Sequence, residues 1–319
     1  METILVTGAT GFIGSNLIPI LLQKGNKVIA LSYPPKTDSI SNILSYDKKI
    51  SFITGDIKDS VFCDKICFGI DKIYHLAALA DVPNSFKNPN DYIDTNIKGT
   101  LNICNAALKN KVSRIIIVSS AAVYGEAQYL PIDETHPLQP KSPYSASKLG
   151  AEAIALSMYY SYYLPITIVR PFNTYGPNQS DNAVISSIIN QIISGKQKIL
   201  VGDLSPKRDF IYATDLCNSM IALSESDAAI GEIVNIGTNV DTSIEEVIAI
   251  IKDVLKKDVV FETDKNLIRH SNSEISEIRC DNSKLISLTG FIPKISVKEG
   301  IAKIIENLFK GTSKNQYYV

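Results

Sequence analysis

The chain begins with a glycine-rich turn between an apolar strand and an apolar helix. The run 4–6 leads into Thr7-Gly8-Ala9-Thr10-Gly11-Phe12-Ile13-Gly14, and a largely apolar segment follows over 16–22. Gly8 permits a tight turn, Gly11 lets the backbone approach a phosphate, and Gly14 lets the helix pack close to the sheet. The helix amides and dipole then face the anion. The turn therefore predicts a site for the pyrophosphate of a dinucleotide, although its Gly-x-x-Gly-x-x-Gly spacing differs from the commoner Gly-x-Gly-x-x-Gly.

Apolar strand candidates alternate with helix-length segments through the first half of the chain, at residues 3–6, 27–31, 50–53, 72–76, 114–118 and 165–169. Such alternation indicates a parallel sheet with helices on both faces. The uninterrupted apolar run Ile115-Ile116-Ile117-Val118 suits a strand that is buried on both sides. We therefore expect an α/β fold with a doubly wound, Rossmann-type parallel sheet. Pro19 removes one hydrogen bond from the first helix and predicts a kink there.

The regular alternation of strand and helix candidates ends after Pro171. Irregular polar segments such as 202–208 mix with shorter helix candidates, and one apolar run at 233–237 looks like a return to the sheet. A chain of 319 residues is long enough for two lobes. We expect residues 1–173 to form an NAD(P)-binding Rossmann domain, with a return near 211–240. Residues 174–319 are then expected to form mainly a smaller α/β lobe that binds the substrate.

Composition excludes several classes of protein. The 32 basic and 33 acidic side chains leave a formal charge of −1, without the basic excess of a nucleic-acid-binding protein. There is no apolar run of about twenty residues, so we expect no membrane span, and no signal peptide is expected either. The five cysteines are scattered, and Cys63-x-x-x-Cys67 has the spacing of neither a redox pair nor a zinc site. We expect a cytoplasmic protein without a metal site.

Tyr144 and Lys148 stand four residues apart, which places both side chains on one face of a helix. A cation beside a phenol favours the phenolate, so we expect the Tyr144 pKa to fall from about 10 toward neutrality. Such a phenol could take the proton of an alcohol while hydride leaves the adjacent carbon. In a chain with 15 tyrosines this spacing alone fits an ordinary surface pair better than a catalytic one.

Two further features favour a catalytic role for Tyr144 and Lys148. Ser119 and Ser120 directly follow the apolar run 114–118, at the carboxyl end of a strand, where open α/β sheets bind their ligands. Pro143 stands immediately before Tyr144, where a helix is expected to begin. Ser120, Tyr144 and Lys148 are therefore the candidate catalytic residues, and we expect them to meet over a nicotinamide ring.

Further motifs follow the glycine turn in order: Gly55-Asp56-Ile57, His75-Leu76-Ala77-Ala78, Asn96-Ile97-Lys98-Gly99-Thr100, Ser119 to Gly125, Tyr144 to Lys148, Arg170-Pro171-Phe172-Asn173 and Arg208-Asp209-Phe210. With the turn, they span nearly the whole chain and resemble the extended short-chain dehydrogenase/reductase family of nucleotide-sugar epimerases and dehydratases. Within that family, the run 170–211 is most similar to enzymes that act on UDP- or GDP-sugars. Some of these are 4-epimerases of the UDP-glucose type, and others are 4,6-dehydratases of the legionaminic-acid type.

The resemblance implies a bound nicotinamide dinucleotide and a nucleotide-sugar substrate. The residues implied at the cofactor are Gly8, Gly11, Phe12, Ile13 and Gly14 at the pyrophosphate, Asp56 and Ile57 at the adenine, Leu76, Ala77, Ala78 and Ala80 beneath the cofactor, and Asn96, Phe172, Tyr144 and Lys148 toward the nicotinamide end. The residues implied at the nucleotide sugar are Ser120, Asn173, Arg208, Arg269 and Glu274. The forked donors of arginine suit a diphosphate, although a surface ion pair is the alternative for each arginine.

The end of the second strand departs from the family pattern. Family members that prefer NAD usually carry an acidic residue there, whereas this chain has Ser32. No carboxylate stands there to repel a 2′-phosphate, and no arginine stands there to bind one; Lys36 is the only nearby candidate. We expect NAD as the cofactor, with Ser32 among its contacts and NADP as the alternative.

A second departure concerns the reaction. Dehydratases of this family place acid and base side chains directly after the catalytic hydroxyl, whereas this chain has Ala121 and Ala122, which cannot transfer protons. Glu126 lies beyond a glycine, and we do not expect it to take their place. The absence of these groups disfavours dehydration and leaves oxidation at C4 of the sugar.

The sequence therefore predicts an NAD-dependent nucleotide-sugar 4-epimerase that works through a 4-keto intermediate. The alternatives are a 4-dehydrogenase, reductase or 4,6-dehydratase of the same family, and a non-catalytic NAD(P)-binding sensor or regulator. Family members pair through the helices that follow Asn96 and Tyr144, so we also expect a homodimer. The apolar residues expected at that interface are Leu101, Ile103, Ala106, Ala107, Ala153, Ile154 and Leu156.

Overall fold

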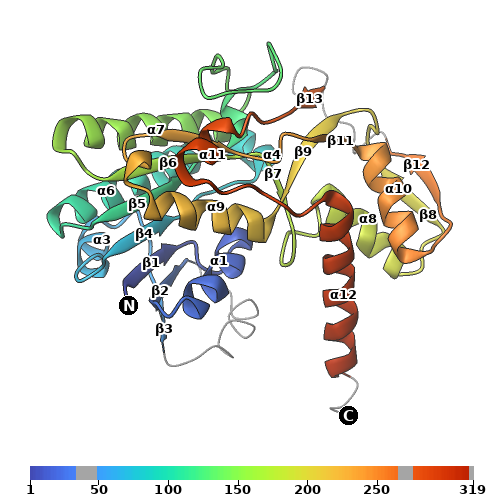
Figure 1. Cartoon of the computed structure of the whole chain (residues 1–319), viewed down its shortest axis with the longest axis horizontal. Coiled ribbons are helices and arrows are strands. Elements are labelled where there is room, and N and C mark those ends of the chain that lie inside the picture. Colours follow the sequence, from blue (N-terminus) through green and yellow to red (C-terminus); the bar gives the residue numbers. More distant parts are fainter. Residues whose placement is uncertain (34–48, 265–275, 316–319) are drawn as a thin grey trace.

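A single parallel sheet dominates the computed structural model, which describes residues 1–33, 49–264 and 276–315 (Figure 1). Its strands are β1 (Thr3–Thr7), β2 (Lys27–Ser32), β3 (Ile50–Thr54), β4 (Lys72–His75), β5 (Arg114–Val118), β6 (Ile166–Pro171) and β10 (Ile233–Ile236). They lie in the order β10-β6-β5-β4-β1-β2-β3, and every neighbouring pair is parallel. The order reverses direction at β1, as in doubly wound folds, so the expected Rossmann-type sheet is confirmed.

Helices cover both faces of this sheet. On one face lie α1 (Phe12–Gln23), α9 (Ala213–Glu225) and α11 (Ser283–Thr289), whose apolar side chains form one core with the strands. On the other face, a second core is built with α3 (Ser60–Ile66), α6 (Gly99–Lys109) and α7 (Pro143–Tyr162). The residues of β5 and β6 are buried along their whole length, which explains the uninterrupted apolar run of β5. The edge strand β3 has no fully buried residue. Shorter elements join them: α4 (Val82–Lys87), α5 (Pro89–Tyr92), the π-helix η1 (Ile93–Lys98), and the 3₁₀ turns η2 (Ala121–Val123) and η3 (Asp227–Ala229).

Helix α1 runs without interruption from Phe12 to Gln23 across Pro19, and a kink at the proline stays a prediction. The missing amide costs one hydrogen bond, but Leu17, Ile18 and Leu21 are fully buried around the proline. Their burial against the sheet outweighs the loss of one helical bond. The return strand expected near 233–237 is present as β10, which pairs with β6.

A third core lies beyond the sheet. It is built largely from isoleucines of α8 (Val184–Ile193), α10 (Ile244–Leu255) and α12 (Val297–Asn315). Its strands form a four-stranded sheet of β7 (Asn173–Tyr175), β9 (Lys207–Tyr212), β11 (Asp241–Ser243) and β13 (Glu277–Ile278), and a two-stranded sheet of β8 (Lys198–Val201) and β12 (Val260–Thr263). Figure 1 shows these elements beside the carboxyl end of the main sheet. A division into two lobes near residue 173 is our proposal for this arrangement.

The conformation of Gly8 provides a test of the turn after β1. Gly8 has φ +68°, and a Cβ built on it would lie 2.8 Å from the backbone nitrogen of Ala77. Gly25 also has a positive φ, of +87°, but a Cβ there would meet nothing within 4 Å. We expect Gly25→Ala to lower the free energy of unfolding by about 1 kcal/mol, from backbone strain alone.

Gly8→Ala adds a backbone collision to the same strain. It should therefore lower the free energy of unfolding by at least about 1 kcal/mol more than the control Gly25→Ala does. Denaturant unfolding of both variants measures the difference. Equal losses would show that the approach to Ala77 is not tight in solution.

Candidate functional site

The glycine turn presents the amino terminus of α1 without a competing side chain. Gly11 is the N-cap residue, with φ −75° and ψ 175°, no side chain caps the helix, and its first turn carries no acidic residue. A Cβ at Gly14 would lie 2.6 Å from the carbonyl oxygens of Gly8 and Ala9, so the turn itself requires glycine there. Open amides and the helix dipole at a cradle without side chains fit a pyrophosphate. The residues present therefore fit the dinucleotide that the sequence predicted.

A cavity of about 490 Å³ opens at this turn. Thr10, Gly11 and Phe12 line one side, and the loop 178–182 lines the other. Helix α1 holds this loop: the Asn16 side-chain amide donates to the Pro177 carbonyl at 2.9 Å, and that of Asn178 donates to Ser15 Oγ at 3.3 Å. The sequence analysis missed the loop. Its run of polar residues after Gly176-Pro177 was the available signal.

Ser120 and Tyr144 meet at the carboxyl edge of the sheet. Ser120 caps η2, and its Oγ accepts a hydrogen bond from the Ala122 amide at 3.1 Å. Helix α7 begins at Pro143, as expected, and a reciprocal Ser142–Ser145 capping box fixes its first turn. Tyr144 lies in that turn and forms a hydrogen bond with the Ser120 side chain. Lys148 lies one turn further along the same helix and is buried.

The expected fall in the Tyr144 pKa is wrong for the protein alone. Burial raises the pKa of Tyr144, the hydrogen bond with Ser120 opposes this, and nearby Tyr92 raises it further. Burial also lowers the pKa of Lys148 to about 8, while the Glu152 carboxylate acts in the opposite direction. Desolvation disfavours both charged forms, so the four-residue spacing by itself does not create a phenolate.

Asn96 stands beneath this region, 1% exposed. Its Oδ1 accepts from the Leu79 amide at 2.8 Å, and its Nδ2 donates to the Leu79 carbonyl at 3.0 Å and to Ser147 Oγ at 2.8 Å. Asn96 therefore joins the segment after β4 to α7. Leu76, Ala77 and Ala78 are partly buried in that segment, and Ala80 is exposed. Direct contact of these residues with a cofactor stays a prediction.

The predicted adenine-end residues lie at the carboxyl ends of β2 and β3. Ser32 is buried, and its Oγ lies 2.6 Å from Thr10 Oγ1 of the glycine turn. Asp56 is partly exposed and accepts from the Lys58 amide at 2.9 Å. Ile57 is buried where a Cβ at Gly99 would come within 2.5 Å of it, so Ile57 also packs on α6. The side chain of Ile13 is partly buried against the α1 core.

Phe172, predicted at the nicotinamide end of the cofactor, is buried beside Tyr124, whereas Asn173, predicted at the substrate, is exposed at the start of β7. Arg208 is 9% exposed on β9, and its Nη1 donates to the Lys207 carbonyl at 2.9 Å. The remaining candidates, Lys36, Arg269 and Glu274, lie outside the described residues. The structure therefore brings Ser120 and Tyr144 together, with Lys148 one turn further along α7, and places Arg208 on the second sheet.

Asp209 is a buried carboxylate that the sequence analysis did not single out. It accepts from the Thr238 amide and hydroxyl at 2.8 and 2.7 Å, and from the amides of Asn239 and Cys280 at 2.8 and 3.1 Å. These bonds fix β9, and with it Arg208, against the segments after β10 and β13. The signal was available, because Asp209 directly precedes the apolar residues 210–212 of one strand, and a carboxylate buried with them must be paired.

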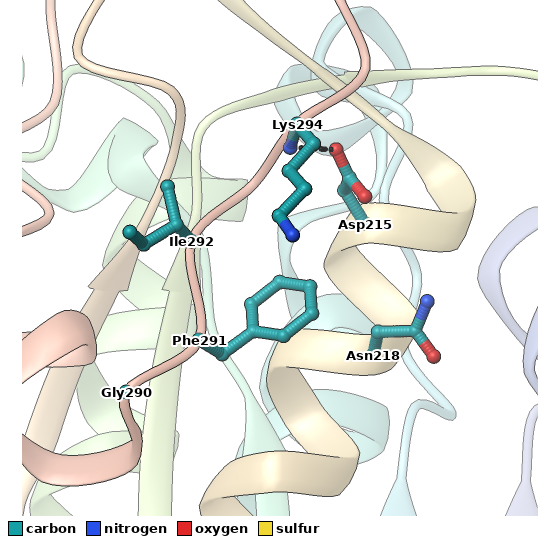
Figure 2. A pocket seen from close by; sticks show the side chains of 6 residues that line it. All are labelled: Asp215, Asn218, Gly290, Phe291, Ile292 and Lys294. Atoms are coloured by element: carbon teal, nitrogen blue, oxygen red, sulfur yellow. Dashed lines mark hydrogen bonds between the residues drawn. The ribbon is translucent and has the colours of Figure 1, made fainter.

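A second cavity, of about 330 Å³, lies between α9 and the segment 290–294 (Figure 2). The carboxylate of Asp215 there accepts the backbone amides of Lys294 and Ile295 at 2.7 and 2.8 Å. Its charge therefore anchors the chain before α12. No group of three or more potential metal ligands was found in the described parts of the chain, and no helix there is long and apolar enough to cross a membrane.

Comparison with known proteins gives the same family along almost the whole length. Residues 5–304 match the profile of the family described as GDP-mannose 4,6 dehydratase. A protein of Methanocaldococcus jannaschii with the provisional name UDP-glucose 4-epimerase is 35% identical over 95% of this chain and 97% of its own. The dTDP-D-glucose 4,6-dehydratase of Homo sapiens is 33% identical over 96% of this chain and 89% of its own.

Solved structures agree with this family assignment. UDP-glucuronic acid 4-epimerase from Bacillus cereus, in complex with UDP-glucuronic acid and NAD, superposes with a TM-score of 0.88 at 29% identity and covers 97% of this chain and 99% of its own. Relatives of both reaction types thus match over full length. The chain belongs to the GDP-mannose 4,6-dehydratase type of the extended short-chain dehydrogenase/reductase family, whose named relatives are nucleotide-sugar epimerases and dehydratases.

Proposed function

We propose that this protein is an NAD-dependent nucleotide-sugar 4-epimerase, and the turn after Ser120 carries the choice of reaction. Ala121 and Ala122 form that turn and offer only methyl groups where a dehydratase needs an acid and a base. Glu126 is engaged elsewhere: its Oε1 accepts from the Ser276 amide and hydroxyl at 3.3 and 3.0 Å, and its Oε2 pairs with Lys141 at 3.4 Å. The nearest acidic side chain in the sequence is therefore held away from this role.

Tyr144 takes the proton of the sugar 4′-hydroxyl in this proposal. Burial raises the pKa of Tyr144, and the Ser120 hydroxyl lowers it. In this proposal charged Lys148, one turn along α7, also favours the Tyr144 anion, so that Tyr144 can work as a base. Ser120 also hydrogen-bonds the sugar oxygen as it becomes a carbonyl. The glycine turn would hold NAD, which would provide the hydride acceptor for oxidation at C4 and the hydride donor for the return step. Arg208 binds the diphosphate, which its forked donors fit.

The choice of NAD over NADP rests on two observations. The Bacillus cereus epimerase is named as a complex with NAD, and Ser32 is buried against Thr10 at the end of β2. A buried serine offers no positive charge to a 2′-phosphate.

All five cysteines are free and buried, which supports the further proposal of a reducing, cytoplasmic location.

A 4,6-dehydratase is the second candidate, because the family profile and the human relative carry that name. A 4-dehydrogenase or reductase uses the same three side chains and differs only in where the reaction stops. A non-catalytic sensor has little support, since the chain carries Ser120, Tyr144 and Lys148, which a sensor would not need, and the named relatives are enzymes.

The mass of the product distinguishes these reactions. We expect UDP- or GDP-sugars incubated with the protein and NAD to change configuration at C4 without any change in mass, and NAD to remain oxidised at the end. Mass spectrometry with absorbance at the reduced-nicotinamide band measures both. A loss of two mass units with accumulating reduced cofactor would establish a 4-dehydrogenase. Loss of water would establish a dehydratase and contradict the argument from Ala121 and Ala122.

Tyr144→Phe tests the general base. We expect turnover to fall by about 10²-fold or more, with the fold retained, because the substitution removes one hydroxyl and keeps the ring. Tyr92→Phe is the matched control: its ring meets that of Tyr144 edge-on at 6.5 Å, and its hydroxyl donates to the Asp81 carbonyl. The control should stay within a few-fold of wild type. A Tyr144→Phe variant with more than about a tenth of the wild-type rate would refute the assignment.

We also propose a homodimer, with a corrected interface. Ile103, Ala106 and Ala107 were expected at the contact, but the structure buries them in the core between α6 and the sheet. The exposed face of α7 carries small side chains instead, including Ala146, Ala153 and Ser157. A row of small residues lets a second helix approach closely.

Ala153→Arg should therefore convert the dimer into a monomer, because a long charged side chain would enter a close helix contact. Light scattering at micromolar concentration measures the mass. Ser287→Arg, an exposed position on α11, is the control and should leave the dimer intact. A monomeric wild-type protein would refute the dimer outright.

A further inference from the structure

A buried ion pair links the two parts of the chain that carry the candidate catalytic side chains. Arg170 lies on β6 and Glu152 on α7, and they are 1% and 2% exposed. The pair is bidentate: Arg170 Nε donates to Glu152 Oε1 at 2.9 Å, and Nη2 donates to Oε2 at 2.6 Å. Such forked pairing fixes orientation as well as distance. Glu152 lies one helical turn beyond Lys148 and two turns beyond Tyr144.

The other side of Arg170 holds the segment after Ser120. Arg170 Nη1 donates to the Tyr124 hydroxyl at 2.8 Å, and its guanidinium carbon lies 4.8 Å from the centre of the Tyr124 ring. Tyr124 follows η2 directly and donates onward to Asn235 Oδ1 on β10 at 2.7 Å. Arg170 therefore contacts both the helix of Tyr144 and Lys148 and the turn of Ser120. A change at Arg170 would reach both at once.

Stability alone does not account for this arrangement. Removing two charges from water is costly, and a buried ion pair is often no more stabilising than apolar side chains of similar size. Its charges, however, act on Lys148 across a medium of low dielectric. Glu152 raises the pKa of Lys148 against the effect of burial, which lowers it to about 8. Arg170 neutralises part of that carboxylate charge.

We propose that Glu152 and Arg170 are positioning residues for the reaction: Glu152 keeps Lys148 in its charged form, and Arg170 holds Glu152 and the Ser120 turn in place. This inference rests on the proposed function, in which charged Lys148 supports the Tyr144 anion. It predicts effects of opposite sign from the two partners. Loss of the carboxylate leaves two buried cations, whereas loss of the guanidinium leaves an unpaired carboxylate near Lys148.

The other titratable groups near Lys148 that are described next do not bring a buried negative charge to it as Glu152 does. His75 on β4 is neutral, because burial and the Lys148 charge lower its pKa to about 3. Tyr92 on α5 faces Tyr144, and Tyr124 stays protonated because burial raises its pKa. The charged side chains on the other elements packed against α7 are exposed to solvent: Lys87, Asp91, Asp94, Lys98 and Lys109.

The experiment measures the titration of Lys148 directly. Trace acetylation with acetic anhydride at a series of pH values, read peptide by peptide by mass spectrometry, reports the fraction of neutral amine with no need for activity. We expect the Lys148 midpoint to fall by about one pH unit in Glu152→Gln and to rise in Arg170→Met. The alkaline limit of turnover should move in the same directions, since it follows loss of the Lys148 charge. Unmoved midpoints, or shifts of the same sign in both variants, would overturn the proposal.

Two further comparisons complete the test. If either single variant fails to fold, the double variant Glu152→Gln/Arg170→Met removes both members of the ion pair and should fold, because neither member is left buried without the other. Its midpoint should lie below that of the wild type, and an unchanged midpoint would refute the role of Glu152. If the midpoints shift as expected but the alkaline limit of turnover does not follow, the inference about the charges holds. In that case the role assigned to Lys148 in the proposed function fails.

Discussion

The parallel direction of the seven strands is the constraint on which the rest of the structure depends. Because β1, β4, β5 and β6 all run the same way, their carboxyl ends meet along one edge of the sheet. The glycine turn, the segment after β4 and the Ser120 turn directly follow those ends, and Arg170 lies one residue before the end of β6. Residues far apart in sequence thereby come to one place, which is where open α/β sheets bind their ligands.

Buried polar side chains then set the positions of these segments. Asn96 joins the segment after β4 to α7, Asp209 ties β9 to the segments after β10 and β13, and Arg170 joins α7 to the Ser120 turn. Each makes several hydrogen bonds in surroundings from which water is excluded, where an unmade bond is costly. The site is thus held by a few polar contacts in a largely apolar frame.

The electrostatics of the site follow from the same burial. Desolvation disfavours both the Tyr144 phenolate and the Lys148 ammonium, so proton removal depends on specific partners. Ser120 supplies a hydrogen bond to the phenol, and Glu152 supplies negative charge to the amine. In the epimerase that we propose, the chemistry is limited to C4 because the neighbouring Ala121 and Ala122 contribute no acid or base.

The sequence by itself determined the fold class, the strands of the main sheet and the glycine turn, and it proposed Ser120, Tyr144 and Lys148 as the catalytic residues. These depend on local signals: period, turn chemistry and residues directly after apolar runs. Only the tertiary structure decided how those groups behave. The direction of the Tyr144 pKa shift, the continuity of α1 across Pro19 and the burial of Ile103 all depend on what packs around them. The Glu152–Arg170 pair spans 18 residues and two elements, and it forms because α7 and β6 pack together, which spacing within one helix cannot show.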